Sequence, residues 1–106
     1  MDLALEVYRL TRAFPKEEQF GMTAQIRRAA ISVPSSIAEG QSRNSTAEFI
    51  QFLGVARGSL AEVETQAELA RRLNWIPESE HQNLMHRVQE AGKMLNGLLS
   101  ALRSKL

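Results

Sequence analysis

Three arginines are the residues of this chain whose types and positions most clearly suggest chemistry. Arg27 and Arg28 are adjacent, and Arg43 follows near the end of the same helical segment. A guanidinium group is always charged and matches the shape of a phosphate or a carboxylate. Arg27 and Arg28 lie about 100° apart around the helix. Together with Arg43 at its far end, they would form a basic edge that binds nucleic-acid phosphates. Ion pairing with carboxylates, within or between subunits, is an equally open interpretation, and no aromatic residue interleaves with them for base stacking.

Other reactive side chains are not arranged for catalysis. The only histidines, His81 and His86, are five residues apart and do not share a helix face closely. Ser32, Ser35 and Ser36 have no histidine or lysine at a recognised spacing that would activate a nucleophile. We therefore expect no catalytic residue, no metal and no cofactor, and we expect the protein not to be an enzyme.

The carboxylates point to the same conclusion. Glu62 and Glu64 are two residues apart on a predicted helix and face different sides. Glu39 lies four residues before Arg43, which favours an ion pair between them.

Composition indicates an ordinary globular domain. The 106 residues carry 43% hydrophobic and 24% charged residues, with a formal net charge of +1 and no cysteine. This length predicts a single domain over 1–106, whose modest core would gain from oligomerisation. The low net charge gives no overall basic field that would indicate nucleic acid by itself. We expect a cytoplasmic protein without membrane contact, because Met1-Asp2 does not begin an export signal and no apolar run could span a bilayer.

The elements that must position the arginines are helices. Apolar residues recur at alternating spacings of three and four, which predicts helices at about 2–13, 23–40, 45–73 and 77–104. The longest seam is unbroken over three heptads: Phe49, Leu53, Ala56, Leu60, Val63, Ala67 and Ala70. Short connections make successive helices antiparallel neighbours. The predicted fold is all-α, an antiparallel up-down-up-down four-helix bundle.

Several residues predict where these helices begin, bend and end. Thr23 is a plausible N-cap, and Ser45 with Glu48 forms a capping box. Pro34 lies inside the second helix and predicts a kink, with the nearby serines placed to satisfy the carbonyl that it frees. Gly40 is expected to stop that helix, and Asn74 to end the third in a left-handed cap.

Two glycines and a proline complete this pattern. Gly54 and Gly58 each weaken the third helix by about 1 kcal/mol relative to alanine, which predicts close approach of a neighbouring helix there. Pro77 suits the first position of the last helix.

A long stretch of the sequence resembles a known family. The resemblance rests on Phe14-Pro15, 20–23, 25–30, 32–35 and 37–40, and then on Arg43, 48–49, 52–53, Ala56, 58–60, Glu62 and 64–65. These residues are similar to the bacterial four-helix-bundle proteins named for the 23S rRNA intervening sequence, the S23 group. The resemblance covers essentially the whole chain. One departure is Ser36, where the family usually has asparagine.

The resemblance implies a small cytoplasmic bundle with no enzymatic activity, of a kind that forms ring-like homopentamers. Some members are encoded inside insertions in ribosomal RNA genes, which implies binding to RNA or another nucleic acid. Accessory proteins of diversity-generating retroelements share the architecture, which leaves open a scaffold for a partner protein such as a reverse transcriptase.

Apolar residues outside the predicted seams fit a homo-oligomer. A monomer would expose several of them, whereas a head-to-tail contact that closes into a ring would bury them. They are Leu5, Tyr8, Ile50, Phe52, Val55 and Leu69. A ring would also repeat the arginines and create a basic surface that a single copy lacks.

Overall fold

The computed structural model describes every residue from Met1 to Leu106, and all of its regular structure is helical. The helices are α1 (Asp2–Thr11), the short 3-10 helix η1 (Lys16–Glu18), α2 (Met22–Gln41), α3 (Thr46–Arg72) and α4 (Glu78–Arg103). The predicted all-α fold with four α-helices is confirmed, and each predicted end lies within two residues of the observed one. None of the helices combines the length and apolarity needed to cross a membrane.

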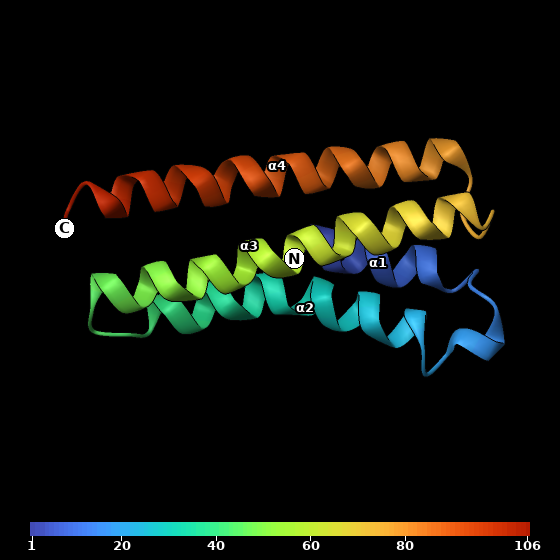
Figure 1. Ribbon diagram of the computed structural model, residues 1–106, viewed down its shortest axis with the longest axis horizontal. Helices are drawn as coiled ribbons and strands as arrows, with labels where there is room; N and C mark the ends of the chain where they lie inside the picture. Colours follow the sequence, from blue (N-terminus) through green and yellow to red (C-terminus); the bar gives the residue numbers. More distant parts are fainter.

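The helices lie side by side along an elongated molecule of 45 × 25 × 18 Å. Figure 1 shows α2 and α3 joined at one end of the molecule, and α3 and α4 joined at the other. Each helix contacts its two neighbours around the bundle, α1 with α2 and α4, and α3 with α2 and α4, whereas the diagonal pairs make no such backbone contacts. α1 begins near the middle of the molecule (Figure 1). It has 10 residues, against 20 in α2, 27 in α3 and 26 in α4.

The predicted apolar stripes form the core. Leu3, Val7, Leu10 and Phe14 are buried along α1 and just beyond it, as their spacing predicts. The α3 seam is buried from Leu53 to Ala70, and its first residue, Phe49, packs against the core. Burial of these seams holds the four helices together, because each helix has only one stripe to protect from water.

Two predicted helix starts have different outcomes. Ser45 caps α3 as predicted, since its hydroxyl accepts the backbone N–H of Glu48 at 3.1 Å, although the Glu48 carboxylate does not bond back. The prediction of Thr23 as N-cap is wrong, because α2 begins at Met22 and the side chain of Thr23 is buried. The Met22 amide instead donates to the Glu18 carboxylate of η1 at 3.2 Å.

The surroundings of Gly40, Gly54 and Gly58 differ from those that the sequence predicts. Gly40 does not end α2, which continues to Gln41, and a Cβ atom there would lie 2.7 Å from a ring carbon of Phe49 and 2.9 Å from Cβ of Phe52. Gly40 therefore permits close packing of α2 on α3. The close approach expected at Gly54 and Gly58 is absent, since nothing lies within 4 Å of a Cβ at either position.

Pro34 lies inside α2, which is one continuous helix. The nearby serines do not bond to the Ala30 carbonyl as expected. Instead Ser59 of α3 donates its hydroxyl to the Ser32 hydroxyl at 2.8 Å, and the Ser32 and Ser36 hydroxyls lie 3.5 Å apart. Ser36 and Ser59 are buried where α2 packs on α3 and Ser32 is half-buried, so these hydroxyls find hydrogen-bond partners in one another.

The α3–α4 connection follows the sequence closely. Asn74 adopts the predicted left-handed conformation with φ of 63°. The Trp75 amide then donates to the Ala70 carbonyl at 2.9 Å, which satisfies an end group of α3. Pro77 is the N-cap of α4, which begins at Glu78. The prediction that Pro77 is the first residue of this helix is therefore wrong by one position.

Candidate nucleic-acid interface

Arg27 lies on the side of α2 that faces α1 and is half-buried. Its Nε donates a hydrogen bond to the Thr11 hydroxyl at 2.8 Å, and its guanidinium carbon lies 4.6 Å from the centre of the Tyr8 ring. A cation over an aromatic face is attracted by the ring's negative surface. No carboxylate lies within ion-pair distance, so Arg27 joins α2 to α1 and keeps its charge uncompensated.

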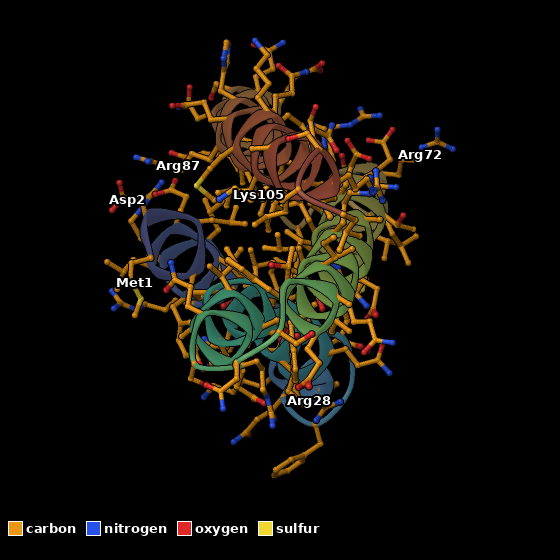
Figure 2. All side chains as sticks on the ribbon, turned by 90° about the vertical axis from the view of Figure 1, so that its left-hand side faces the viewer. Met1, Asp2, Arg28, Arg72, Arg87 and Lys105 are labelled. Carbon is orange, nitrogen blue, oxygen red and sulfur yellow. The ribbon has the colours of Figure 1, made fainter.

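Arg28 points to another side of the same helix, as adjacency dictates. It is exposed and borders a shallow pocket of about 310 Å³ between α2 and α3, together with Gln25, Ser32, Ser59 and Glu62. It forms no ion pair. In the end-on view of Figure 2, Arg28 extends from the lower side of the bundle, away from α4.

Arg43 lies in the connection between α2 and α3. Its Nη2 is 3.7 Å from a Glu39 carboxylate oxygen, which confirms the predicted pairing. The guanidinium carbon also lies 5.0 Å from the centre of the Phe52 ring. At 1.5 Å per residue, Arg28 and Arg43 are about 22 Å apart along the helix direction. The fold therefore places Arg27 and Arg28 toward one end of α2 and Arg43 beyond the other.

A second pair of adjacent arginines, Arg71 and Arg72 of α3, differs from Arg27 and Arg28 because it forms ion pairs with a carboxylate. In α3 the Glu68 carboxylate accepts hydrogen bonds from Arg71 at 2.7 and 3.0 Å, and Nε of Arg72 lies 3.4 Å from it. The hydrogen bonds from Arg71 lower the pKa of Glu68 to about 2, and the charges of Arg71, Arg72 and His81 act in the same direction. Arg71 and Arg72 therefore share one carboxylate, which compensates one of their two charges, whereas Arg27 and Arg28 have none.

One further cation was not among the predicted site residues. Arg12 is exposed, forms no ion pair and directly follows Thr11, the residue that Arg27 contacts. The signal that could have found it is the short connection from α1 to α2, which brings the end of α1 beside the start of α2. The cations without an ion pair at this end thus include Arg12, Lys16, Arg27 and Arg28.

The two histidines, for which the sequence predicts no role in metal binding, both lie on α4. His81 is half-buried, and its Nε2 is 3.6 Å from a Glu68 oxygen. His86 is exposed and borders the same pocket of about 430 Å³ as His81 and Glu68. No cluster of three or more histidine, aspartate or glutamate side chains has a geometry that could hold a metal ion.

Comparison with known proteins places the chain in a family. Residues 1–97 match the family model described as 23S rRNA-intervening sequence protein. A similar crystal structure is that of a protein with unknown function from the S23 ribosomal protein family of Bacteroides thetaiotaomicron VPI-5482. It shares 25% sequence identity with this chain over 92% of each, with a TM-score of 0.85. No curated protein matches. The chain belongs to the 23S rRNA-intervening sequence protein family.

Proposed function

We propose that this protein is a non-enzymatic, cytoplasmic helical bundle that assembles into a ring and binds structured RNA or another nucleic acid through a repeated basic surface. The residues of that surface are Arg27, Arg28 and Arg43. The observation that carries the proposal is that Arg27 and Arg28 have no carboxylate partner, whereas both arginines of the adjacent pair on α3 form ion pairs with Glu68. An uncompensated guanidinium group is free to exchange counterions for phosphate.

The ring is part of the proposal because one subunit carries a net charge of only +1. Exposed apolar side chains support self-association: Leu5 is 68% exposed, Val55 54% and Leu69 48%. A closed ring would bury such residues and, by repeating the arginines, would create a surface with several contacts to one RNA. We propose five copies, the number implied by the family resemblance, each an up-down-up-down bundle with α2 bent at Pro34.

The proposal is tested by RNA binding at several salt concentrations. The probe is a fluorescent RNA hairpin of mixed sequence, and binding to Arg28→Ala and Arg27→Ala/Arg28→Ala proteins is compared with wild type. Each lost phosphate contact should lower the slope of log K against log salt by roughly 0.7–0.9. Arg28→Ala isolates the exposed group, because Arg27 also has a contact with α1 to lose.

The matched control is Arg71→Ala/Arg72→Ala, which removes an adjacent pair of arginines that both form ion pairs with Glu68. We expect this variant to retain most of the affinity. Absence of binding by the wild type at low salt, or an equal loss in both double variants, would contradict the proposal.

A second candidate function is a scaffold for a partner protein such as a reverse transcriptase. The observation that favours it is the exposed apolar surface, which a partner could cover as well as a second copy could. Recovery of one protein in fixed stoichiometry after nuclease treatment would favour this alternative over RNA binding.

A further inference from the structure

The most exposed large apolar side chain of the protein is Phe20, of which 89% is accessible to solvent. It lies between η1 and Gly21, the N-cap of α2. The other three phenylalanines are all packed, since Phe14 is buried and Phe49 and Phe52 are half-buried. The core therefore does not account for an aromatic ring at position 20.

The backbone around Phe20 is held by hydrogen bonds on both sides. The Gly21 amide donates to the Glu18 carbonyl at 3.0 Å, and the Gln25 amide donates to the Gly21 carbonyl at 3.0 Å. The Met22 amide donates to the Glu18 carboxylate at 3.2 Å. The turn that carries Phe20 is thus tied to the start of α2, so the exposed ring has a fixed place beside that helix.

The charge around Phe20 is positive. Residues 12–28 include two glutamates, Glu17 and Glu18, and four cations, so this segment has an excess of two positive charges, more than the +1 of the whole chain. None of the four cations lies within ion-pair distance of a carboxylate. Two precede Phe20 and two follow it: Arg12, Lys16, Arg27 and Arg28. Such a surface favours an anionic partner.

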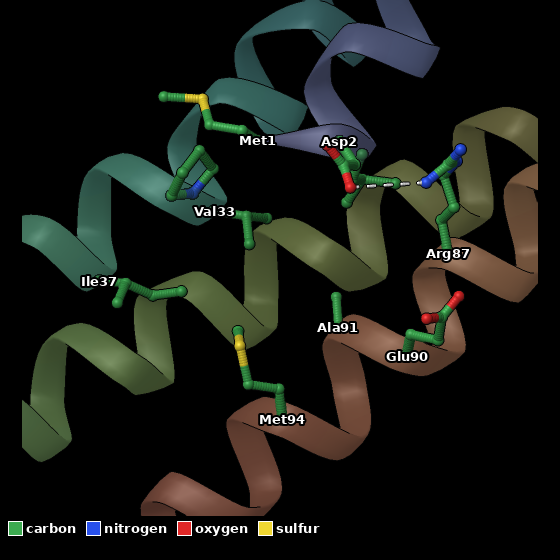
Figure 3. Close-up of a pocket in the computed structure, with 10 residues that line it drawn as sticks. Met1, Asp2, Val33, Ile37, Arg87, Glu90, Ala91 and Met94 are labelled. Atoms are coloured by element: carbon green, nitrogen blue, oxygen red, sulfur yellow. Dashed lines mark ion pairs between the residues drawn. The ribbon is translucent and has the colours of Figure 1, made fainter.

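The largest hollow of the molecule differs in this respect. It has a volume of about 550 Å³ and lies between α2 and α4. Nη1 of Arg87 there is 3.9 Å from the Asp2 carboxylate, and Glu90 is a further acidic residue of the lining (Figure 3). Because its cation is already compensated, this hollow is a poorer place for an anion than the surface around Phe20.

The spacing of Phe20 and Arg28 fits a short stretch of single strand. Arg28 lies six residues inside α2 from Met22, which is about 9 Å at 1.5 Å per residue. The two residues from Phe20 to Met22 add at most about 7 Å. The two backbone positions are therefore at most about 16 Å apart, the length of about five nucleotides at 3.4 Å each. Figure 1 shows the α1–α2 connection extending beyond the ends of both helices, where a strand can reach it.

We propose that Phe20 stacks on an unpaired base of a single-stranded nucleic acid, while Arg12, Lys16 and Arg28 contact the phosphates on either side. This inference rests on the proposed function and adds the form of nucleic acid that is preferred, namely unpaired nucleotides such as those of an RNA loop. Every base has a face on which an aromatic ring can stack, so the site tolerates many sequences. Within a continuous duplex the bases stack on one another and offer Phe20 no free face.

The test compares two fluorescent RNAs, a 12-nucleotide single strand without internal pairing and a blunt duplex of 12 base pairs, by anisotropy at several salt concentrations. Phe20→Ala should weaken binding of the single strand about 5- to 150-fold, as loss of one stacked base does. The slope of log K against log salt should not change, because stacking releases no counterions. Binding of the duplex should change less than about twofold. Arg28→Ala, in contrast, should lower the salt slope for both RNAs.

Three control variants separate stacking from other effects. Phe20→Trp keeps an aromatic face and should retain the affinity for the single strand, whereas Phe20→Leu is apolar without such a face and should lose about as much as Phe20→Ala. Leu106→Ala should bind as the wild type does, because Leu106 is 74% exposed at the opposite end of the molecule (Figure 1). Wild-type affinity of Phe20→Ala or Phe20→Leu for the single strand, or an equal loss on the duplex, would overturn the proposal.

The remaining outcomes concern another occupant and the proposed function itself. If Phe20→Ala lowers the mass of the particle in light scattering while Leu106→Ala does not, Phe20 contacts a second copy and the stacking proposal is wrong. If Arg28→Ala weakens RNA binding and Phe20→Ala does not, the proposed function stands and this inference fails. Absence of binding to both RNAs at low salt would contradict both.

Discussion

Replacement of Gly40 by alanine should destabilise the protein even though Gly40 lies inside a helix. The backbone there has no positive φ, so alanine can adopt it, and in open surroundings the change would stabilise the helix by about 1 kcal/mol. The added Cβ would lie 2.7 Å from the Phe49 ring and 2.9 Å from Cβ of Phe52. Phe52 Cβ is fixed by the α3 backbone, so α2 and α3 must move apart.

Overpacking of this kind costs about 1–3 kcal/mol, and both contacts are severe enough to favour the upper part of that range. After the gain in helix propensity, the expected net loss is about 1–2 kcal/mol in the free energy of unfolding. For a domain of this size, each kcal/mol corresponds to a fall of about 4–8 °C in the melting temperature.

The assay is urea unfolding followed by circular dichroism, with thermal unfolding as a second measurement. Gly97→Ala in α4 is the control, since nothing lies within 4 Å of a Cβ there, and it should stabilise by up to about 1 kcal/mol. If Gly40→Ala is as stable as wild type or more so, the account of close packing between α2 and α3 is refuted.

Three further predictions concern the ends and pairings of the helices. Ser45→Ala removes the hydroxyl that caps α3 and should cost about 1 kcal/mol in urea unfolding, whereas Ser45→Asp should retain most of the stability. The pKa of Glu68 in the folded state is lowered to about 2, chiefly by hydrogen bonds from Arg71. The ionised Glu68 side chain therefore stabilises the folded state above the ordinary glutamate pKa, and this stabilisation is lost as pH falls from about 4.5 to 2. Glu68→Gln should flatten this part of a plot of unfolding free energy against pH. Arg27→Ala should lower stability by about 1–2 kcal/mol through loss of the bond to Thr11 and the contact with α1, and equal stability of this variant and wild type would contradict the described packing.

The sequence was sufficient to predict the helices and their buried faces because those follow from local spacing. Leu53 and Leu60 belong to a seam that repeats with alternating steps of four and three, and both are buried as this pattern requires. Ser45 and Asn74 also behave as predicted, since capping and the left-handed turn depend on a few adjacent residues.

Features that depend on which helix lies opposite could not be predicted in this way. Gly40 has the sequence context of a helix end, but its role is set by two phenylalanines of α3. Ser32 has a partner, Ser59, 27 residues away, which local spacing does not identify. The distinction between the two pairs of arginines, by contrast, follows from local spacing, because Glu68 lies three and four residues before Arg71 and Arg72, whereas no carboxylate lies at these spacings before Arg27 and Arg28.

The native mass of the protein in solution tests the central claim most directly, because the repeated basic surface exists only if the subunits assemble. Light scattering on the particle eluted from a size-exclusion column gives this mass independently of shape. The account predicts about five times the subunit mass of 11.9 kDa, unchanged on dilution through the micromolar range. A particle of 11.9 kDa at all concentrations would contradict it, because the exposed apolar side chains would then have no second copy to cover them.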